Sequence, residues 1–274
     1  MGKPAEACGK YAKAVEIAPR HADAYFGWGS ALGEMGKHAE ACKKFAKAVE
    51  INPRNADAYC IWGLALGKMG KHAEACGKCA KAVEINPRDA GAYCIWGFAL
   101  GKMGKHAEAC EKYAKAIEID PRHANAHSNW GVALRQMGRC AEACEKHAKA
   151  AELAPRDADA HFEWGNTLAS MLKHDPACKE YAKAVESDPR SADAHYNWGK
   201  TLASMLEYDQ ACGKFAKATE INPRHASAWF DWGVALACLE KKAEAIEKLD
   251  KAAALDPALK PKVEELRKEL LGKK

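Results

Sequence analysis

Apolar and polar residues follow a helical period along the chain, in paired segments separated by turn residues. The first segment of one pair runs from Ala22 to Glu34 and aligns Tyr25, Trp28 and Leu32 on one helix face. The second runs from Ala39 to Ile51 and aligns Ala41, Cys42, Phe45, Ala48 and Val49. Gly36 interrupts the pattern between them, and Pro53 ends the second segment because proline disfavours a helical residue before it. The pattern predicts a helical hairpin.

The hairpin pattern recurs with a period of 34 residues. The second segments end at prolines that keep this phase, namely Pro19, Pro53, Pro87, Pro121, Pro155, Pro189, Pro223 and Pro257. The first segments carry Trp-Gly pairs in the same phase, at Trp28, Trp62, Trp96, Trp130, Trp164, Trp198 and Trp232. A hairpin cannot bury both of its faces alone, so consecutive hairpins must stack around a continuous core. We therefore predict an all-α fold of the α-solenoid type.

The recurring residues resemble the signature of the tetratricopeptide repeat family. In the unit that starts at Ala22 they are Tyr25, Trp28, Gly29, Leu32, Gly36, Ala41, Phe45, Ala48 and Pro53. The resemblance spans seven units between Ala22 and Leu259. It implies a right-handed α-solenoid, a superhelix of stacked antiparallel helix pairs, in which Gly29 and Ala41 stay small where two helices approach closely.

The period divides the chain into a partial repeat, a run of full repeats and a final helix. Residues 1–21 supply a lone second helix, and residues 260–274 form a solvating C-terminal helix. The seven repeats between them are 22–55, 56–89, 90–123, 124–157, 158–191, 192–225 and 226–259. Solenoids need polar caps at their ends, and the first helix has none. We expect it to be covered by a second copy in a homodimer or by an upstream segment.

Two repeats depart locally from the pattern. Leu172 and Leu206 stand where the other repeats have the turn glycine. Pro176 enters a second helix, and the preceding Asp175 predicts an N-cap with proline in the first turn, where its missing N–H costs nothing. These departures leave the predicted fold unchanged.

Charge and hydropathy exclude several classes of protein. The net charge of +5 comes from 42 basic and 37 acidic residues without a run of like charge, which is too weak for a dedicated nucleic-acid binder. The longest nearly apolar stretch, residues 58–67, is half of what a membrane span of about 20 residues needs. The first residues are followed by charged helical sequence rather than by a signal core, so we expect a cytoplasmic protein.

The chain has twelve cysteines, and seven of them share one repeat position: Cys8, Cys42, Cys76, Cys110, Cys144, Cys178 and Cys212. Equivalent Cα atoms on stacked helices lie roughly 8–10 Å apart, whereas a disulfide needs about 7 Å or less. We therefore interpret these cysteines as small buried hydrophobic residues in a reducing compartment.

A metal- or redox-responsive role is the alternative interpretation of the cysteines. His72 precedes Cys76 by one helical turn, Cys79 follows in a Cys-x-x-Cys spacing, and similar His/Cys turns recur at Cys42, Cys110 and Cys178. Each turn offers two ligands on one helix face, and two ligands do not close a metal site. We expect no metal site and no cofactor.

The sequence contains no signature of an enzyme. It has no glycine-rich phosphate loop that opens a helix, no serine in a nucleophile-elbow sequence and no carboxylate pair outside the repeat pattern. Histidines fall at repeat positions, as when His127, His161 and His195 replace the aromatic residue Tyr25. We predict a protein without catalytic activity.

The positions of the first helices that vary between repeats and lie off the core face are candidates for recognition. The resemblance implies that they line a concave groove that binds peptides. In the N-terminal repeats these positions are mostly apolar: Phe26, Cys60, Ile61, Leu64, Cys94, Ile95, Phe98 and Val132. Clustered exposed apolar side chains of this kind usually mark a contact surface.

The same positions are polar in the C-terminal repeats, with aromatic residues between them. They include Asn129, Arg135, Glu163, Asn166, Asn197, Lys200, Phe230 and Asp231. Because amides donate and accept hydrogen bonds, an asparagine row can hold a peptide backbone regardless of its sequence. We predict a scaffold that binds a protein or peptide segment in the groove, the alternatives being the metal- or redox-responsive role and a self-assembling solenoid.

Overall fold

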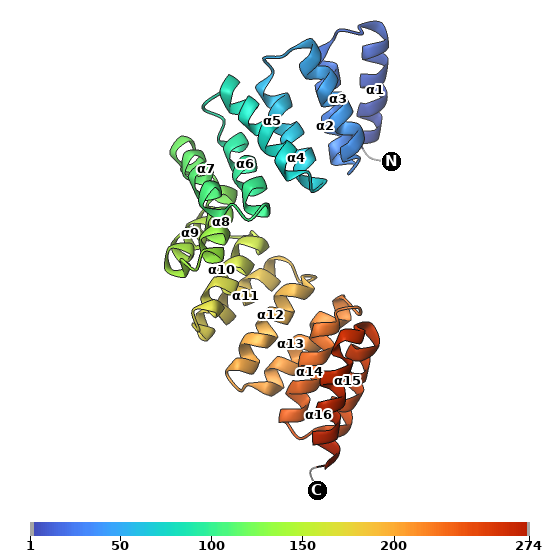
Figure 1. Ribbon diagram of the computed structural model, residues 1–274, viewed down its shortest axis with the longest axis vertical. Helices are drawn as coiled ribbons and strands as arrows, with labels where there is room; N and C mark the ends of the chain where they lie inside the picture. The colour runs from blue at the N-terminus through green and yellow to red at the C-terminus, as the bar shows by residue number, and fades with distance from the viewer. Residues whose placement is uncertain (1–2, 273–274) are drawn as a thin grey trace. The chain divides into compact units, whose positions relative to one another are not determined.

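The structure is a computed structural model that describes residues 3–272 as a run of helices (Figure 1). The first eight are α1 (Lys3–Ile17), α2 (Ala22–Glu34), α3 (His38–Ile51), α4 (Ala56–Lys68), α5 (His72–Ile85), α6 (Ala90–Lys102), α7 (His106–Ile119) and α8 (Ala124–Gln136). The others are α9 (Cys140–Leu153), α10 (Ala158–Ser170), α11 (His174–Ser187), α12 (Ala192–Ser204), α13 (Tyr208–Ile221), α14 (Ala226–Cys238), α15 (Lys242–Leu255), the 3₁₀ turn η1 (Pro257–Leu259) and α16 (Lys260–Gly272). No strand occurs within residues 3–272, which agrees with the predicted all-α class.

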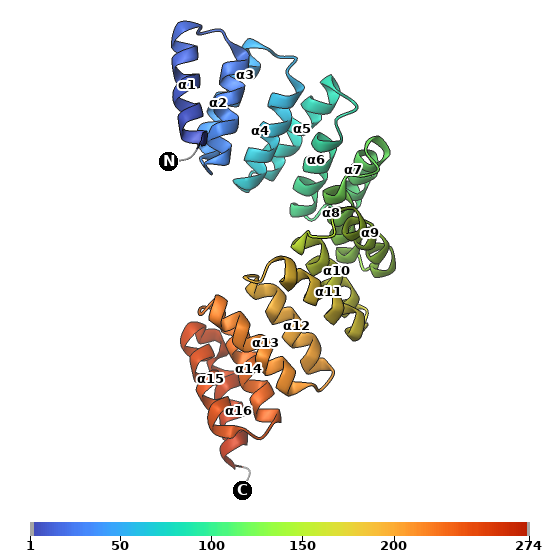
Figure 2. The same ribbon diagram turned by 180° about the vertical axis from the view of Figure 1, so that it is seen from behind.

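The chain divides into two compact units, one up to Lys146 and one from His147 onward. In the first unit, α2 packs on α3, α4 on α5 and α6 on α7, and each pair forms an antiparallel hairpin (Figures 1 and 2). Consecutive hairpins stack through α3 on α4 and α5 on α6. The second unit contains the equivalent hairpins α10/α11, α12/α13 and α14/α15. The stacked helix pairs predicted from the 34-residue period are confirmed.

The two helices of a hairpin approach each other at the glycine of the Trp-Gly pair. A Cβ atom added to Gly29 would lie 2.6 Å from the ring of Phe45, which is fully buried. A Cβ atom on Gly97 would lie 2.7 Å from the ring of Tyr113 in the same way. Any side chain at these positions would force the helices apart.

Polar side chains fix the start of the first helices. The carboxamide oxygen of Asn55 accepts a hydrogen bond from the backbone N–H of Ala58 at 2.9 Å. At His123 the imidazole Nδ1 takes this role, 3.3 Å from the backbone nitrogen of Ala126. Each cap satisfies a backbone donor that the helix itself leaves without a partner.

The turns inside the hairpins use the left-handed region of the backbone. Gly36 has φ +74°, and Leu172 and Leu206, which replace the turn glycine, have φ +58° and +63°. A residue with a Cβ atom adopts this region at a cost of about 1–2 kcal/mol. The hairpin geometry therefore overrides the preference of two leucines.

Helix α11 begins before the predicted N-cap. Its N-cap is Lys173, so the prediction that Asp175 caps the helix is wrong. Lys37 and Lys71 are the N-caps of α3 and α5, because the turn ends at the same repeat position in each hairpin. Pro176 still lies in the first turn of α11, as expected.

The final helix covers the end of the second unit. Val263 of α16 is 3% exposed and packs with Leu249 of α15. Arg267 donates a hydrogen bond from Nη2 to Oδ2 of Asp250 at 2.9 Å. By contrast, α1 has no fully buried residue, and its Ile17 is 86% exposed. Within the described part of the chain, no helix is long and apolar enough to span a membrane.

Candidate peptide-binding groove

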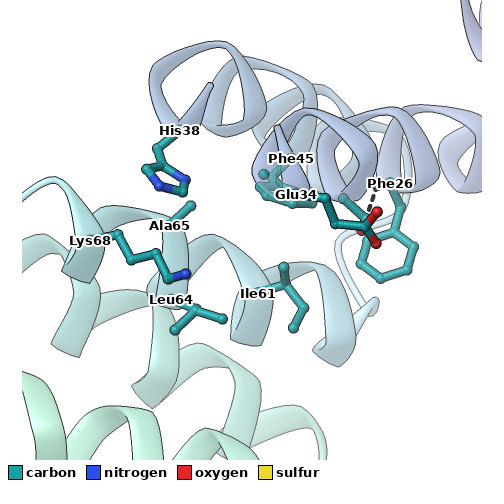
Figure 3. Close-up of a pocket in the computed structure, with 10 residues that line it drawn as sticks. Phe26, Glu34, His38, Phe45, Ile61, Leu64, Ala65 and Lys68 are labelled. Atoms are coloured by element: carbon teal, nitrogen blue, oxygen red, sulfur yellow. Dashed lines mark hydrogen bonds between the residues drawn. The ribbon is translucent and has the colours of Figure 1, made fainter. Parts of the chain in front are cut away.

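A pocket of about 400 Å³ opens between α2 and α4 in the first unit (Figure 3). Figure 3 shows Phe26 and Glu34 of α2 across the pocket from Leu64 and Lys68 of α4, with His38 of α3 at one end. The full lining is Phe26, Ser30, Gly33, Glu34, His38, Phe45, Ile61, Leu64, Ala65 and Lys68. The pocket thus brings together three predicted groove residues, which are Phe26, Ile61 and Leu64.

The pocket is mostly apolar, and the aromatic side chain of Phe26 in its wall packs on a buried aromatic residue. The ring centroids of Phe26 and Phe45 lie 6.1 Å apart with the rings tilted by 47°, so the buried Phe45 supports Phe26. The Ser30 hydroxyl donates to the carbonyl oxygen of Phe26 at 3.1 Å, so the polar groups at the pocket are chiefly the side chains of Glu34, His38 and Lys68. Leu64 is 37% exposed, so an apolar partner could remove its side chain from water.

The apolar residues Phe26, Ile61 and Leu64 begin an apolar stripe, which continues on α6 with Ile95 and Phe98. Phe98 occupies the repeat position of Leu64 and is 38% exposed, with the ammonium of Lys102 5.2 Å from its ring centroid. Ile95 is only half-buried and packs beside Cys60. On α8 the next predicted groove residues, Val132 and Arg135, are also half-buried.

The expected exposure of Cys60 and Cys94 is wrong. Each thiol side chain is 7% exposed and packs in the core, Cys60 against Ala82 and Ala92. Burial raises the pKa of the Cys94 thiol to about 11. Phe26 shares their repeat position but is long enough to reach the pocket, whereas a cysteine ends inside the core. These two residues therefore contribute packing rather than groove surface.

Hydrogen bonds connect the asparagines of the second unit. The amide oxygen of Asn166 accepts from the hydroxyl of Tyr181 at 2.9 Å and from Nδ2 of Asn197 at 2.9 Å. Both lone pairs of that oxygen are used, so Asn166 cannot also accept a hydrogen bond from a peptide backbone. Asn166 thus positions Asn197, and peptide binding by the asparagine row stays a prediction. In the first unit, the side chain of Asn129 is near enough to the Cys94 thiol to lower its pKa slightly against the effect of burial.

Two of the remaining groove residues of the second unit, Lys200 and Asp231, lie beside Tyr196. Its hydroxyl donates to Oδ2 of Asp231 at 2.9 Å, and the ammonium of Lys200 lies 5.5 Å from its ring centroid. Burial of Asp231 raises the pKa of its carboxyl group. Glu163 lies one helix away, with Oε2 3.5 Å from Nδ2 of Asn166. Phe230 instead packs against the cluster formed with α16.

The structure gives the metal- or redox-responsive alternative no support. The described chain contains no group of three or more His, Cys, Asp or Glu side chains placed to hold a metal ion. Burial raises the pKa of the Cys42, Cys76 and Cys110 thiols, which disfavours the reactive thiolate. Cys42 and Trp62 of the next hairpin pack against the same buried cluster around Phe45, as expected for a structural side chain.

Sequence reasoning missed several residues of these surfaces. His38 lines the pocket although it opens a second helix, and the signal was the recurrence of histidine at His72 and His106. Glu180 is buried beside His161, and the signal was its replacement of a lysine that other repeats have at this position. Neither contact follows from helical periodicity, because each joins two helices.

Comparison with known proteins places these features in a family. Residues 29–70 and 100–138 match the pattern described as TPR repeat, and residues 226–259 match tetratricopeptide repeat. No curated protein matches the sequence. Among solved structures, YrrB, described as a TPR protein with an unusual peptide-binding site, is 28% identical with a TM-score of 0.58, and the match covers 68% of this chain and 97% of YrrB.

Two further solved structures share the fold. The pilF protein of Pseudomonas aeruginosa is 21% identical, with a TM-score of 0.68 over 81% of this chain and 100% of its own. The match to the structure of the APC/C hetero-tetramer Cut9-Hcn1 is 18% identical, with a TM-score of 0.73 over 96% of this chain and 52% of that chain.

Proposed function

The chain is a tetratricopeptide repeat protein, and we propose that it is a non-catalytic scaffold that binds a peptide or protein segment in the groove formed by its first helices. One observation carries this proposal. The pocket between α2 and α4 is apolar and open, and the stripe continues to Phe98, so Leu64 and Phe98 keep more than a third of their surface in water. Covering such side chains favours association by roughly 25 cal/mol for each Å² buried.

The spacing of the stripe sets the kind of segment that fits. Leu64 and Phe98 occupy one repeat position on the neighbouring helices α4 and α6, which pack on each other. Packed helix axes lie about 8–10 Å apart, a distance that an extended peptide spans in about three residues. A segment in the polyproline II conformation has three residues per turn, so apolar residues at every third position would all face Leu64 and Phe98. The peptide-binding site named for YrrB supports this class of ligand.

The absence of catalysis is part of the same proposal. The partly buried thiols of Cys42 and Cys76 have raised pKa values and pack together with Trp62, which suits a structural role. The polar groups of the second unit are hydrogen-bonded to one another rather than arranged as a nucleophile with a base. Members of this repeat family typically act as scaffolds for protein interaction.

Selection from a random peptide library on the immobilised full chain tests the proposal. We expect enriched peptides with spaced apolar residues, and at least tenfold weaker binding to Leu64→Asp and Phe98→Asp variants. Met103→Asp is the matched control, because Met103 is 41% exposed but lies at the C-cap of α6. Equal losses in all three variants, or no enriched peptide at all, would refute the proposal.

Self-association is a second candidate function, favoured by the exposure of α1. Tyr11 of α1 faces Gly27 of α2, but the helix has no fully buried residue and Ile17 is 86% exposed. Pairing of α1 with the same helix of a second copy would form a two-fold contact. Sedimentation velocity across a hundredfold concentration range tests it: a mass that stays at one chain excludes the homodimer.

A further inference from the structure

The predicted groove face of the second unit carries a carboxylate with few hydrogen-bond partners, that of Asp231. Asp231 of α14 accepts a hydrogen bond from the hydroxyl of Tyr196 at 2.9 Å and is half-buried. A carboxylate has about four positions for hydrogen-bond donors, so most of its capacity is open. Burial raises the pKa of this carboxyl group, as expected when the charged form lacks partners.

Lys200 is a basic side chain near this carboxylate. Lys200 of α12 lies one helical turn beyond Tyr196, and its ammonium is 5.5 Å from the Tyr196 ring centroid. In the described part of the chain no ion pair joins Lys200 to Asp231, although the lysine is near enough to favour the charged carboxylate. Lys200 is exposed, so an incoming side chain could displace it.

Two aromatic rings, tilted by 50° to each other, lie beside Asp231. The ring centroids of Tyr196 and His225 are 4.6 Å apart, and Tyr196 is supported from below by Phe215 at 6.1 Å. The Nδ1 atom of His225 accepts the backbone N–H of Ala228, so Nε2 is the protonated nitrogen.

A second carboxylate borders the same aromatic pair. Oδ1 of Asp193 lies 3.7 Å from Nε2 of His225, and the Asp193 side chain is 79% exposed. Asp193, Tyr196 and Lys200 fall on one face of α12, at spacings of three and four residues. Two carboxylates thus flank an aromatic pair on the groove face.

We infer that this part of the groove is a subsite for an arginine side chain of the bound segment, with Asp231 and Asp193 as its anionic partners and Tyr196 as its stacking surface. A guanidinium is planar, donates several hydrogen bonds in a fork and stacks on aromatic rings, which fits two carboxylates beside a ring. The inference rests on the proposed function, because the arginine belongs to the segment bound in the groove. The arginine subsite requires that the bound segment carry a basic residue where it contacts α12 and α14.

The test uses peptides selected on the full chain from a random library. We expect arginine to be enriched at one position, and replacement of that arginine by glutamine to weaken binding about tenfold. Against Asp231→Asn, which retains an acceptor for Tyr196, the same replacement should have little effect. Asp193→Asn, at an exposed side chain, provides a second variant that should reduce the difference without disturbing the fold.

The outcomes separate this inference from the proposed function. Enrichment of apolar residues without arginine, or an equal effect of glutamine on the wild type and both variants, would overturn the arginine subsite alone. Enrichment of Asp or Glu that is lost in Lys200→Met would also overturn it and make Lys200 the anchor. A library from which no peptide is enriched would overturn both.

Discussion

The imidazole Nδ1 of His161 lies 2.7 Å from the carboxylate Oε2 of Glu180, and both side chains are less than a tenth exposed. The other ring nitrogen lies 3.1 Å from the carbonyl oxygen of Pro155, so both nitrogens face acceptors. Lys183 completes the group at 2.9 Å from Oε1 of Glu180. In the repeat 90–123 the position of Glu180 holds Lys112, which lies 4.2 Å from the ring centroid of Trp96. The repeat 158–191 thus has a buried contact between Glu180 and His161 where the repeat 90–123 has Lys112 stacked on Trp96.

Removal of one partner of this contact should be costly. In Glu180→Ala, His161 would stay buried without its carboxylate, and we expect a loss of about 3 kcal/mol in the free energy of unfolding. Urea unfolding followed by circular dichroism measures this loss. The double variant His161→Tyr with Glu180→Lys recreates the residues of the repeat 90–123 and should recover most of it. A double variant as unstable as Glu180→Ala would show that the pair is not the cause.

Acid should weaken the second unit through His195. Burial lowers the pKa of this imidazole, so the unfolded chain binds more protons than the folded chain in acid. Its contribution is fully present above the ordinary histidine pKa of about 6.5 and is lost as the pH falls through the lower folded value. Urea midpoints at pH 7.5 and pH 5 should therefore differ less in His195→Tyr than in the wild type. Identical pH dependence in the two proteins would contradict this assignment.

Replacing the turn leucines Leu172 and Leu206 by glycine should increase the stability of the protein. Leu172 and Leu206 have φ +58° and +63°, which glycine adopts without a Cβ penalty. We expect Leu172→Gly and Leu206→Gly each to raise the stability by about 1 kcal/mol. Gly36→Leu is the reciprocal control, since a Cβ atom there meets no neighbour and only the backbone would be strained. Thermal melts in which all three variants shift in the same direction would contradict the explanation.

Chelators should leave the protein unchanged. The thiols of Cys42 and Cys76 are partly buried with raised pKa values, and no cluster of three potential ligands occurs among residues 3–272. A structural zinc ion would contribute on the order of 10 kcal/mol to folding. The melting temperature should therefore be the same with and without EDTA, and stoichiometric metal found by mass spectrometry would restore the metal-responsive alternative.

Helix positions in this protein follow from local sequence. The segments expected at Ala22–Glu34 and 39–51 correspond to α2 over Ala22–Glu34 and α3 over His38–Ile51. The signals that set the helix bounds act over a few residues: helical periodicity, glycine at the turn and proline after the second helix. They can therefore be identified in the sequence alone. Repetition extended the same inference to every hairpin and, through the stacking argument, to the all-α class.

The exposure and the hydrogen-bond partners of the groove residues depend on side chains from different helices that come together only when the hairpins stack. Phe26 and Cys60 share one repeat position, yet one lines a pocket and the other is buried, because side-chain length decides what the neighbouring helix covers. The amide oxygen of Asn166 accepts a hydrogen bond from the hydroxyl of Tyr181 on α11, a contact that the repeat pattern does not contain. The bond from Tyr196 to Asp231 spans 35 residues and joins α12 to α14. Helical period places a side chain on a face, but its partners are set by the packing of the next hairpin.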